Sequence, residues 1–164
     1  MTRSMRAVTI AATVLGLSGL GTGSAAAEAS EGAMVPLGAK LRACDFSMLD
    51  FVGTNGTASG QGFISTGGGN TVSATLNFAI GHPNTPYQVR LIQGPRPGTQ
   101  RCNAGDPGVA STVLNTDGNG TGSVTLTAPR QSGATNAWLF VEGPPDPGQI
   151  RGEFYTSDQP TRLS

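Results

Sequence analysis

TVSATLNFAIGHPNTPYQVRLIQ, residues 71–93, is the stretch that decides the fold predicted for this chain. In residues 71–80 apolar side chains alternate with small or polar ones, and residues 87–93 repeat the pattern around Tyr87, Val89 and Leu91. A period of two is typical of a strand with one buried face. The residues between the two runs are rich in Gly, Pro and Asn, which favour a turn. The stretch therefore predicts an antiparallel hairpin around which the other strands pack.

Further strand-like runs flank this hairpin on both sides. They lie at residues 40–45, 58–65, 109–115, 123–128, 137–142 and 149–156. Residues 109–115 and 123–128 are predicted partners across the TDGNGTG turn, whereas AWLFVE at 137–142 is apolar on both faces and predicts a central, covered strand. About eight closely spaced strands without a helical period predict an all-β fold. We expect a single antiparallel β-sandwich, Ig-like or Greek-key, with a small barrel as the alternative.

The first 27 residues have the features of a secretory signal peptide. Arg3 and Arg6 precede a short apolar run, and Ala25 and Ala27 then form a small-residue cleavage pattern. The run is interrupted by glycine, which argues against a retained membrane helix, and no later run is long enough to span a bilayer. We therefore expect a secreted or extracytoplasmic protein of the cell envelope or periplasm.

The expected mature chain has three parts. Residues 28–38 are predicted to be a flexible leader, residues 39–157 the β domain, and residues 158–164 a polar tail. Its charge is close to balanced, because ten Lys and Arg less Arg3 and Arg6 leave eight against ten Asp and Glu. A slight negative excess argues against nucleic acid or an anionic membrane as a partner. We expect an unknown protein or envelope component instead.

Cys44 and Cys102 are the two cysteines of the chain. In an exported protein such an even pair is typical of a disulfide. The alternative is two free thiols or a metal pair, but no His/Cys cluster accompanies them. Closing a loop of roughly 58 residues would stabilise the fold by about 4 kcal/mol in the loop-closure model.

No residue set in this sequence specifies a reaction. His82 is the only histidine, lies in a predicted turn and has no nucleophile motif to serve. Glu142 and Glu153 could supply the paired carboxylates of a glycosidase, or simply keep a strand end soluble. We therefore predict neither catalysis nor a cofactor. The alternative function, a small-ligand carrier or an enzyme, requires a pocket between the sheets.

Residues 94–108, GPRPGTQRCNAGDPG, form the predicted binding surface together with the turn at His82. Loops fixed on a rigid scaffold are where such folds bind partners. Arg90, Arg96 and Arg101 surround this loop and could bind an anion, although a set of solvated loop charges is the alternative.

The turn at residues 117–122 also admits two interpretations. Asp117, Asn119 and Thr121 match positions 1, 3 and 5 of a calcium-binding loop. However, Ala128 occupies the position where a bidentate Glu is needed, and Asp, Asn and Gly also favour ordinary hairpin turns. A calcium-stabilised envelope domain is thus a further alternative to a plain turn.

The segment WLFVEGPPDPGQIRGEFY at residues 138–155 resembles the closing strand pair of chordin-type (CHRD) domains. The matching residues are Pro147, Gly148, Ile150, Arg151 and Gly152. Residues 86–89 look like the strand that carries histidines in that family, but Gln88 and Arg90 stand there in this chain. The resemblance implies a secreted, Greek-key-like β domain of interaction type and transfers no catalytic or metal residues.

Overall fold

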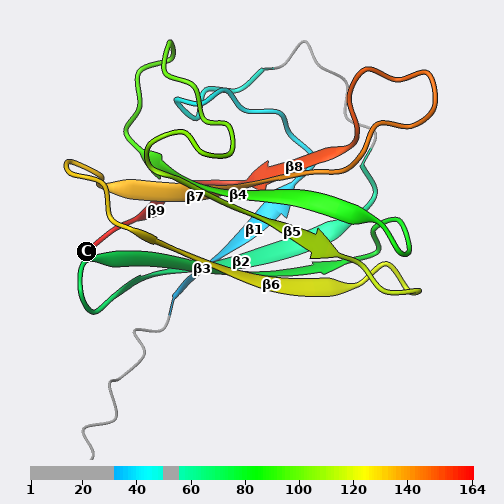
Figure 1. Cartoon of the computed structure of the whole chain (residues 1–164), viewed down its shortest axis with the longest axis horizontal. Coiled ribbons are helices and arrows are strands. Elements are labelled where there is room, and N and C mark those ends of the chain that lie inside the picture. Colours follow the sequence, from blue (N-terminus) through cyan, green and yellow to red (C-terminus); the bar gives the residue numbers. More distant parts are fainter. Residues whose placement is uncertain (1–31, 50–55) are drawn as a thin grey trace, which may run out of the picture.

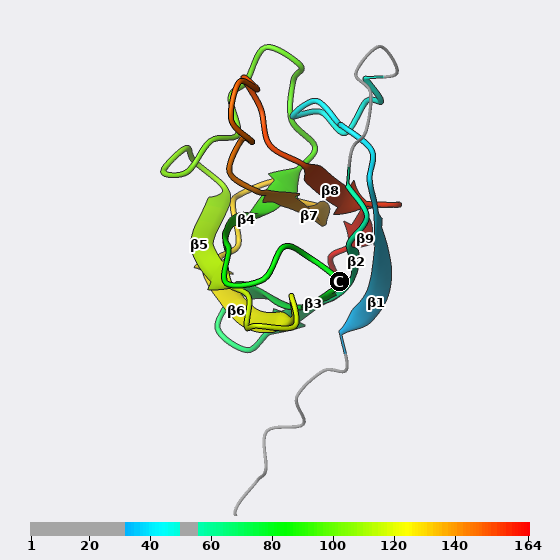
Figure 2. The ribbon, with the colours of Figure 1, turned by 90° about the vertical axis from the view of Figure 1, so that its right-hand side faces the viewer.

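Nine strands form one continuous antiparallel sheet in the computed structural model, which describes residues 32–49 and 56–164 (Figure 1). The strands are β1 (Ala33–Gly38), β2 (Ser59–Gly67), β3 (Thr71–Ala79), β4 (Pro86–Gly94), β5 (Val109–Asn115), β6 (Gly122–Pro129), β7 (Asn136–Glu142), β8 (Phe154–Ser157) and β9 (Thr161–Arg162). Their order in the sheet is β5-β4-β7-β8-β1-β2-β3-β6, and β9 pairs with β7. The two end strands, β5 and β6, lie beside each other, so the sheet is nearly closed into a barrel (Figure 2).

The prediction of an all-β antiparallel domain is confirmed, whereas the sandwich is not. All the strands belong to one sheet that curls around a common interior, instead of two separate sheets facing each other. Alternating side chains indicate one buried face in both architectures. The pattern therefore predicts strands correctly without deciding how the sheet closes.

The predicted hairpin at residues 71–93 is wrong, although both of its strands exist. β3 pairs with β2 and β6, whereas β4 pairs with β5 and β7. Residues 80–85 cross the end of the barrel between them (Figure 1). The two strands do share the interior, because the rings of Phe78 and Tyr87 lie 4.8 Å apart. Periodicity thus identified the buried faces and missed the neighbours.

The crossover at residues 80–85 is held by the turn that follows β5. Gly81 donates its N–H to the Gly120 carbonyl at 3.0 Å, and Asn84 donates to the Asp117 carbonyl at 3.0 Å. The predicted pairing of β5 with β6 across this turn is not found, since no ladder joins them in the described part of the chain. The seam of the barrel runs between these two strands.

Both ends of the predicted domain lie elsewhere than expected. β1 occupies most of the predicted leader at 28–38, and residues 40–45 form a loop with a single bridge between Arg42 and Met48. The predicted polar tail at 158–164 contains β9 and the buried Leu163. The predicted last strand at 149–156 is shorter, because regular pairing begins only at β8. The predicted signal peptide, 1–27, lies outside the described residues.

The core has two layers. The larger one fills the barrel with inward-facing side chains of the strands, among them Val72, Leu76, Tyr87, Leu139 and Tyr155. The second lies on the outer face of β4, β7 and β8. It contains Leu41, Ile92, Cys102, Trp138, Phe140 and Phe154. Because Trp138, Leu139 and Phe140 are all buried, the prediction that residues 137–142 form a central, covered strand is confirmed.

Candidate binding site

The second core layer is covered by loops that the predicted disulfide joins. Cys44 and Cys102 are bonded, which confirms that prediction, and their Cα atoms are 5.6 Å apart. The bond ties the loop at residues 39–49 to the loop at residues 94–108. In Figure 1 both loops lie over β4, β7 and β8, together with the loop at residues 143–153. We call these three loops the cap.

Arg90 anchors the cap to the sheet. Its guanidinium donates to the Glu142 carboxylate at 2.8 Å and to the Cys102 carbonyl at 3.3 Å. It also stacks on the Phe140 ring at 4.2 Å. Burial lowers the pKa of Arg90, and the neighbouring Glu142 charge opposes that shift. With these partners, Arg90 holds the loop at residues 94–108 against the sheet.

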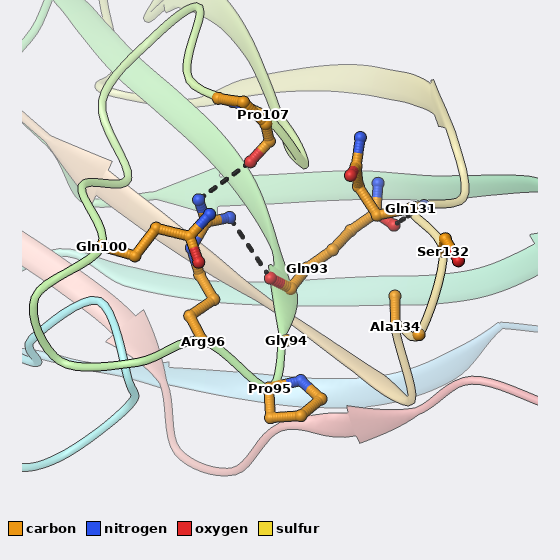
Figure 3. Close-up of a pocket in the computed structure, with 10 residues that line it drawn as sticks. Gln93, Gly94, Pro95, Arg96, Gln100, Pro107, Gln131, Ser132 and Ala134 are labelled. Atoms are coloured by element: carbon orange, nitrogen blue, oxygen red, sulfur yellow. Dashed lines mark hydrogen bonds between the residues drawn. The ribbon is translucent and has the colours of Figure 1, made fainter.

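Arg96 is the most deeply buried of the predicted anion-binding arginines, with 8% of its surface exposed. Its guanidinium donates to three backbone carbonyls, those of Gln93, Arg101 and Pro107. Figure 3 shows its bonds to Gln93 and Pro107. No carboxylate of the described residues lies within 4.0 Å of it, and its Nε has no hydrogen-bond partner there. Asp106 acts on it only from a greater distance. Among the described residues, Arg96 is therefore a buried cation whose direct hydrogen-bond partners are backbone carbonyls, with Asp106 farther away.

A pocket of about 120 Å³ lies beside Arg96. It opens between the start of the loop at residues 94–108 and the turn at residues 131–134 (Figure 3). Its lining is polar and includes Gln93, Gln100, Gln131 and Ser132. Gln93 fixes the two sides to each other, because its amide donates to the Pro129 carbonyl at 2.9 Å and accepts from the Gln131 N–H at 2.8 Å. Amide and guanidinium groups around a small pocket can bind a carboxylate or an amide.

The other two predicted binding residues lie apart from this pocket. Arg101 is exposed on the loop at residues 94–108. His82 lies in the crossover before β4, at the end of that strand opposite to Arg96, and its side chain is 62% exposed. The structure therefore brings Arg96 close to the backbone of Arg101 but does not gather Arg90, Arg96, Arg101 and His82 into one site.

A buried carboxylate at the end of the barrel was not predicted. The Glu153 side chain is 8% exposed and accepts hydrogen bonds from the hydroxyls of Tyr87 and Tyr155, the latter at 2.5 Å. Each hydroxyl also accepts a backbone N–H, from His82 and Ala58 respectively, at 2.9 Å. Burial, and then the bond to Glu153, raise the pKa of both tyrosines. The sequence signal was the position of the two tyrosines on inward faces, since a buried hydroxyl needs a partner.

Glu142 and Glu153 have different partners. Glu142 lies opposite Phe154 in the β7–β8 ladder and bonds to Arg90, with Arg151 3.9 Å away. Glu153 has the two tyrosines as partners, with the His82 imidazole 3.8 Å away. The two carboxylates therefore have separate environments.

Asp117 folds back onto its own turn. Its carboxylate accepts hydrogen bonds from the backbone N–H groups of Asn119 and Thr121, at 2.8 and 2.9 Å, and from the Thr121 hydroxyl at 2.7 Å. These bonds, with those from Thr121 largest, lower the pKa of Asp117. The arrangement is that of a side-chain-capped turn. Calcium binding by Asp117, Asn119 and Thr121 stays a prediction.

Among the described residues, no group of three or more His, Cys, Asp and Glu side chains is placed to hold a metal ion. Within the same residues no helix is long and apolar enough to span a membrane. Comparison of the chain with protein-family models, with curated proteins and with solved structures found no match.

Proposed function

We propose that this protein is exported and acts outside the cytoplasm as a non-catalytic binding protein, with its recognition pocket beside Arg96. The export-like N-terminus and the Cys44–Cys102 disulfide support the location, because disulfides persist mainly in oxidising compartments. The cap supports a binding role, because covalently joined loops on a nearly closed barrel form a rigid binding surface.

The observation that carries the proposal is the buried Arg96 guanidinium, which has no carboxylate within 4.0 Å among residues 32–49 and 56–164 and lies next to a polar pocket. Burying a cation is unfavourable unless it is paired. Three carbonyls offset part of this penalty, and an anion in the pocket would offset more. A pocket of about 120 Å³ is smaller than the sites that enclose drug-sized ligands, but it accommodates a carboxylate group. The proposed partner is therefore a protein or envelope component that presents a carboxylate.

Export and the disulfide are tested on protein recovered from outside the cytoplasm of the host cell. Intact mass should correspond to a chain beginning at Glu28 with both cysteines oxidised. A recovered protein that retains residues 1–27, or that reacts with a thiol reagent before reduction, would contradict the proposed location.

The pocket is tested by NMR titration of the exported protein with acetate and succinate at constant ionic strength, with chloride as the reference anion. Saturable shifts are expected at the Arg96 Nε–H and the Gln131 amide. Arg96→Lys keeps the charge but loses the planar fork, and should weaken binding at least tenfold. Arg101→Lys is the matched control at an exposed position and should leave the titration unchanged. Shifts that do not saturate, or equal binding by Arg96→Lys, would rule out the pocket.

A further inference from the structure

One continuous sector of the barrel wall carries no ionisable side chain. The sequences of β1, β2, β3, β5 and β6 contain no Asp, Glu, Lys, Arg or His. β1, β2, β3 and β6 are consecutive in the sheet, and β5 lies beside β6 across the seam. Soluble domains usually have about a quarter or more charged residues on their surface, so an uncharged sector of this width is unusual.

On the outer surface of β3 and β6, hydroxyl and amide side chains form a regular ladder. Side chains of β3 bond in order to those facing them on β6: Ser73 to Thr127, Thr75 to Thr125 and Asn77 to Ser123, each at 2.9 Å. The members of each strand are two residues apart, so they lie in rows along one face. Because each pair fixes both of its side chains, the polar atoms of this ladder are held in place before any ligand arrives.

A cavity of about 450 Å³ lies on the same surface, over β1, β2 and β3. Met34, Pro36 and Ala79 supply its apolar side chains, and Met34 is 55% exposed. Gln61, Asn77 and Ser59 supply amide and hydroxyl groups, and both amides are exposed. The volume lies within the range of small-molecule and cofactor sites. Asn77 belongs to both the cavity and the ladder, so the two form one continuous surface.

The chemistry of this surface selects an uncharged partner rich in hydroxyl groups. A charged polymer would lose hydration here without gaining an ion pair. Amides both donate and accept hydrogen bonds, as sugar hydroxyls do, and apolar side chains suit the C–H faces of sugar rings. We propose that the outer face of β1, β2, β3 and β6 binds a neutral polysaccharide. One sugar occupies the cavity beside Gln61 and Asn77, and its neighbours lie along the ladder. This site is independent of the Arg96 pocket.

The test is native gel electrophoresis of the exported protein through gels that contain a polysaccharide. Hydroxyethylcellulose, laminarin and galactomannan are the neutral polymers, and carboxymethylcellulose is the charged match to the first. We expect retardation by at least one neutral polymer, and binding to that polymer in solution that is the same at low salt and in 0.5 M salt. No retardation by any neutral polymer, or stronger retardation by carboxymethylcellulose, would overturn the proposal.

Substitutions test whether the polysaccharide binds at the cavity and the ladder. Gln61→Ala with Asn77→Ala should reduce affinity for the retarding polymer at least tenfold, and Thr75→Arg should do so by putting a charge on the ladder. Arg101→Lys, on the cap, is the control and should bind as the parent does. Circular dichroism confirms that each variant is folded. If Thr75→Arg instead dissociates a dimer seen by light scattering while polymer binding is unchanged, the surface joins two copies of the chain and the polysaccharide proposal is wrong.

Discussion

β7 and β3 lie in opposite walls of the same barrel and differ in what covers their outer faces. On β7 both faces are buried, because the cap packs over Trp138 and Phe140. On β3 only alternate residues are buried, and the outward ones are Thr, Ser and Asn, with Ala79 at the end of the strand. The difference teaches that the charged side chains of the barrel wall and the loops that cover it lie on the same side of the protein. The wall that carries Arg90 and Glu142 also carries the cap. No loop of residues 32–49 and 56–164 covers the uncharged wall, which we call the bare wall.

Removal of the disulfide should have the largest effect on the free energy of unfolding. The bond belongs to the cap, on the β7 side of the barrel, and the bare wall has no such cross-link. Cys44→Ser with Cys102→Ser should lower the free energy of unfolding by about 4 kcal/mol, since it frees a long loop in the unfolded chain. Urea unfolding followed by Trp138 fluorescence measures this. A loss below about 1 kcal/mol would mean that the cap is held by packing without the bond.

The next largest difference in stability is expected between a buried residue of the cap and an exposed residue of the bare wall. Leu41 is 6% exposed in the second core layer, and Met34 is 55% exposed on β1. Leu41→Ala should cost about 3 kcal/mol, whereas Met34→Ala should stay within about 0.5 kcal/mol. Equal losses in urea unfolding would show that the cap is not a true second layer of the core.

The hydrogen bonds of Tyr87 and Tyr155 to Glu153, at the end of the barrel, should contribute less to the free energy of unfolding. Tyr155→Phe removes a donor to Glu153 and an acceptor for the Ala58 N–H, which should cost about 1 to 2 kcal/mol.

The same tyrosines predict a pH dependence with a definite sign. Their pKa is raised in the folded state, so the folded protein holds these protons more tightly than the unfolded chain. Their contribution is complete below about pH 10, the ordinary tyrosine pKa, and is lost as the pH rises above it. The parent should therefore lose stability more steeply than Tyr155→Phe as the pH rises from about 9 to about 11, a range centred on the ordinary tyrosine pKa. Parallel slopes would contradict the shift.

The smallest effect is expected within the ladder of the bare wall. A double-mutant cycle of Thr75→Ala and Thr125→Ala should give a coupling of about 0.5 kcal/mol, typical of a cross-strand pair. A coupling above about 1.5 kcal/mol would mean that the ladder supports the barrel, and is not merely displayed on it.

Local patterns predicted the strands and their faces better than their partners. Alternation in β3 and continuous apolar character in β7 are properties of single segments, so they could be recognised in the sequence. The neighbours of β3 are fixed by closure of the sheet, which no segment encodes alone. Pro36 made residues 33–38 resemble a leader, yet it lies where β1 pairs with β2 and not with β8.

The glycines of β2 also have a role in the structure that the sequence alone did not predict. Considered in the sequence alone, Gly60 and Gly62 predict a weak strand that is either bulged or at an edge. In the barrel they face inward, where a Cβ at Gly62 would collide with Leu139 from the opposite wall. For the candidate site, the pairing of Cys44 with Cys102 could be predicted by counting. The burial of Arg96 could not, because it depends on three carbonyls that only the folded loops bring together.

The position of β8 has a consequence for the order of folding. In the sheet β8 stands between β7 and β1, so it joins the strand just before it in the chain to β1, which lies more than a hundred residues earlier. Contacts between residues so distant in sequence form slowly. The barrel is therefore expected to complete itself only after its last strands are available, and a chain still emerging from the ribosome should remain open for most of its synthesis.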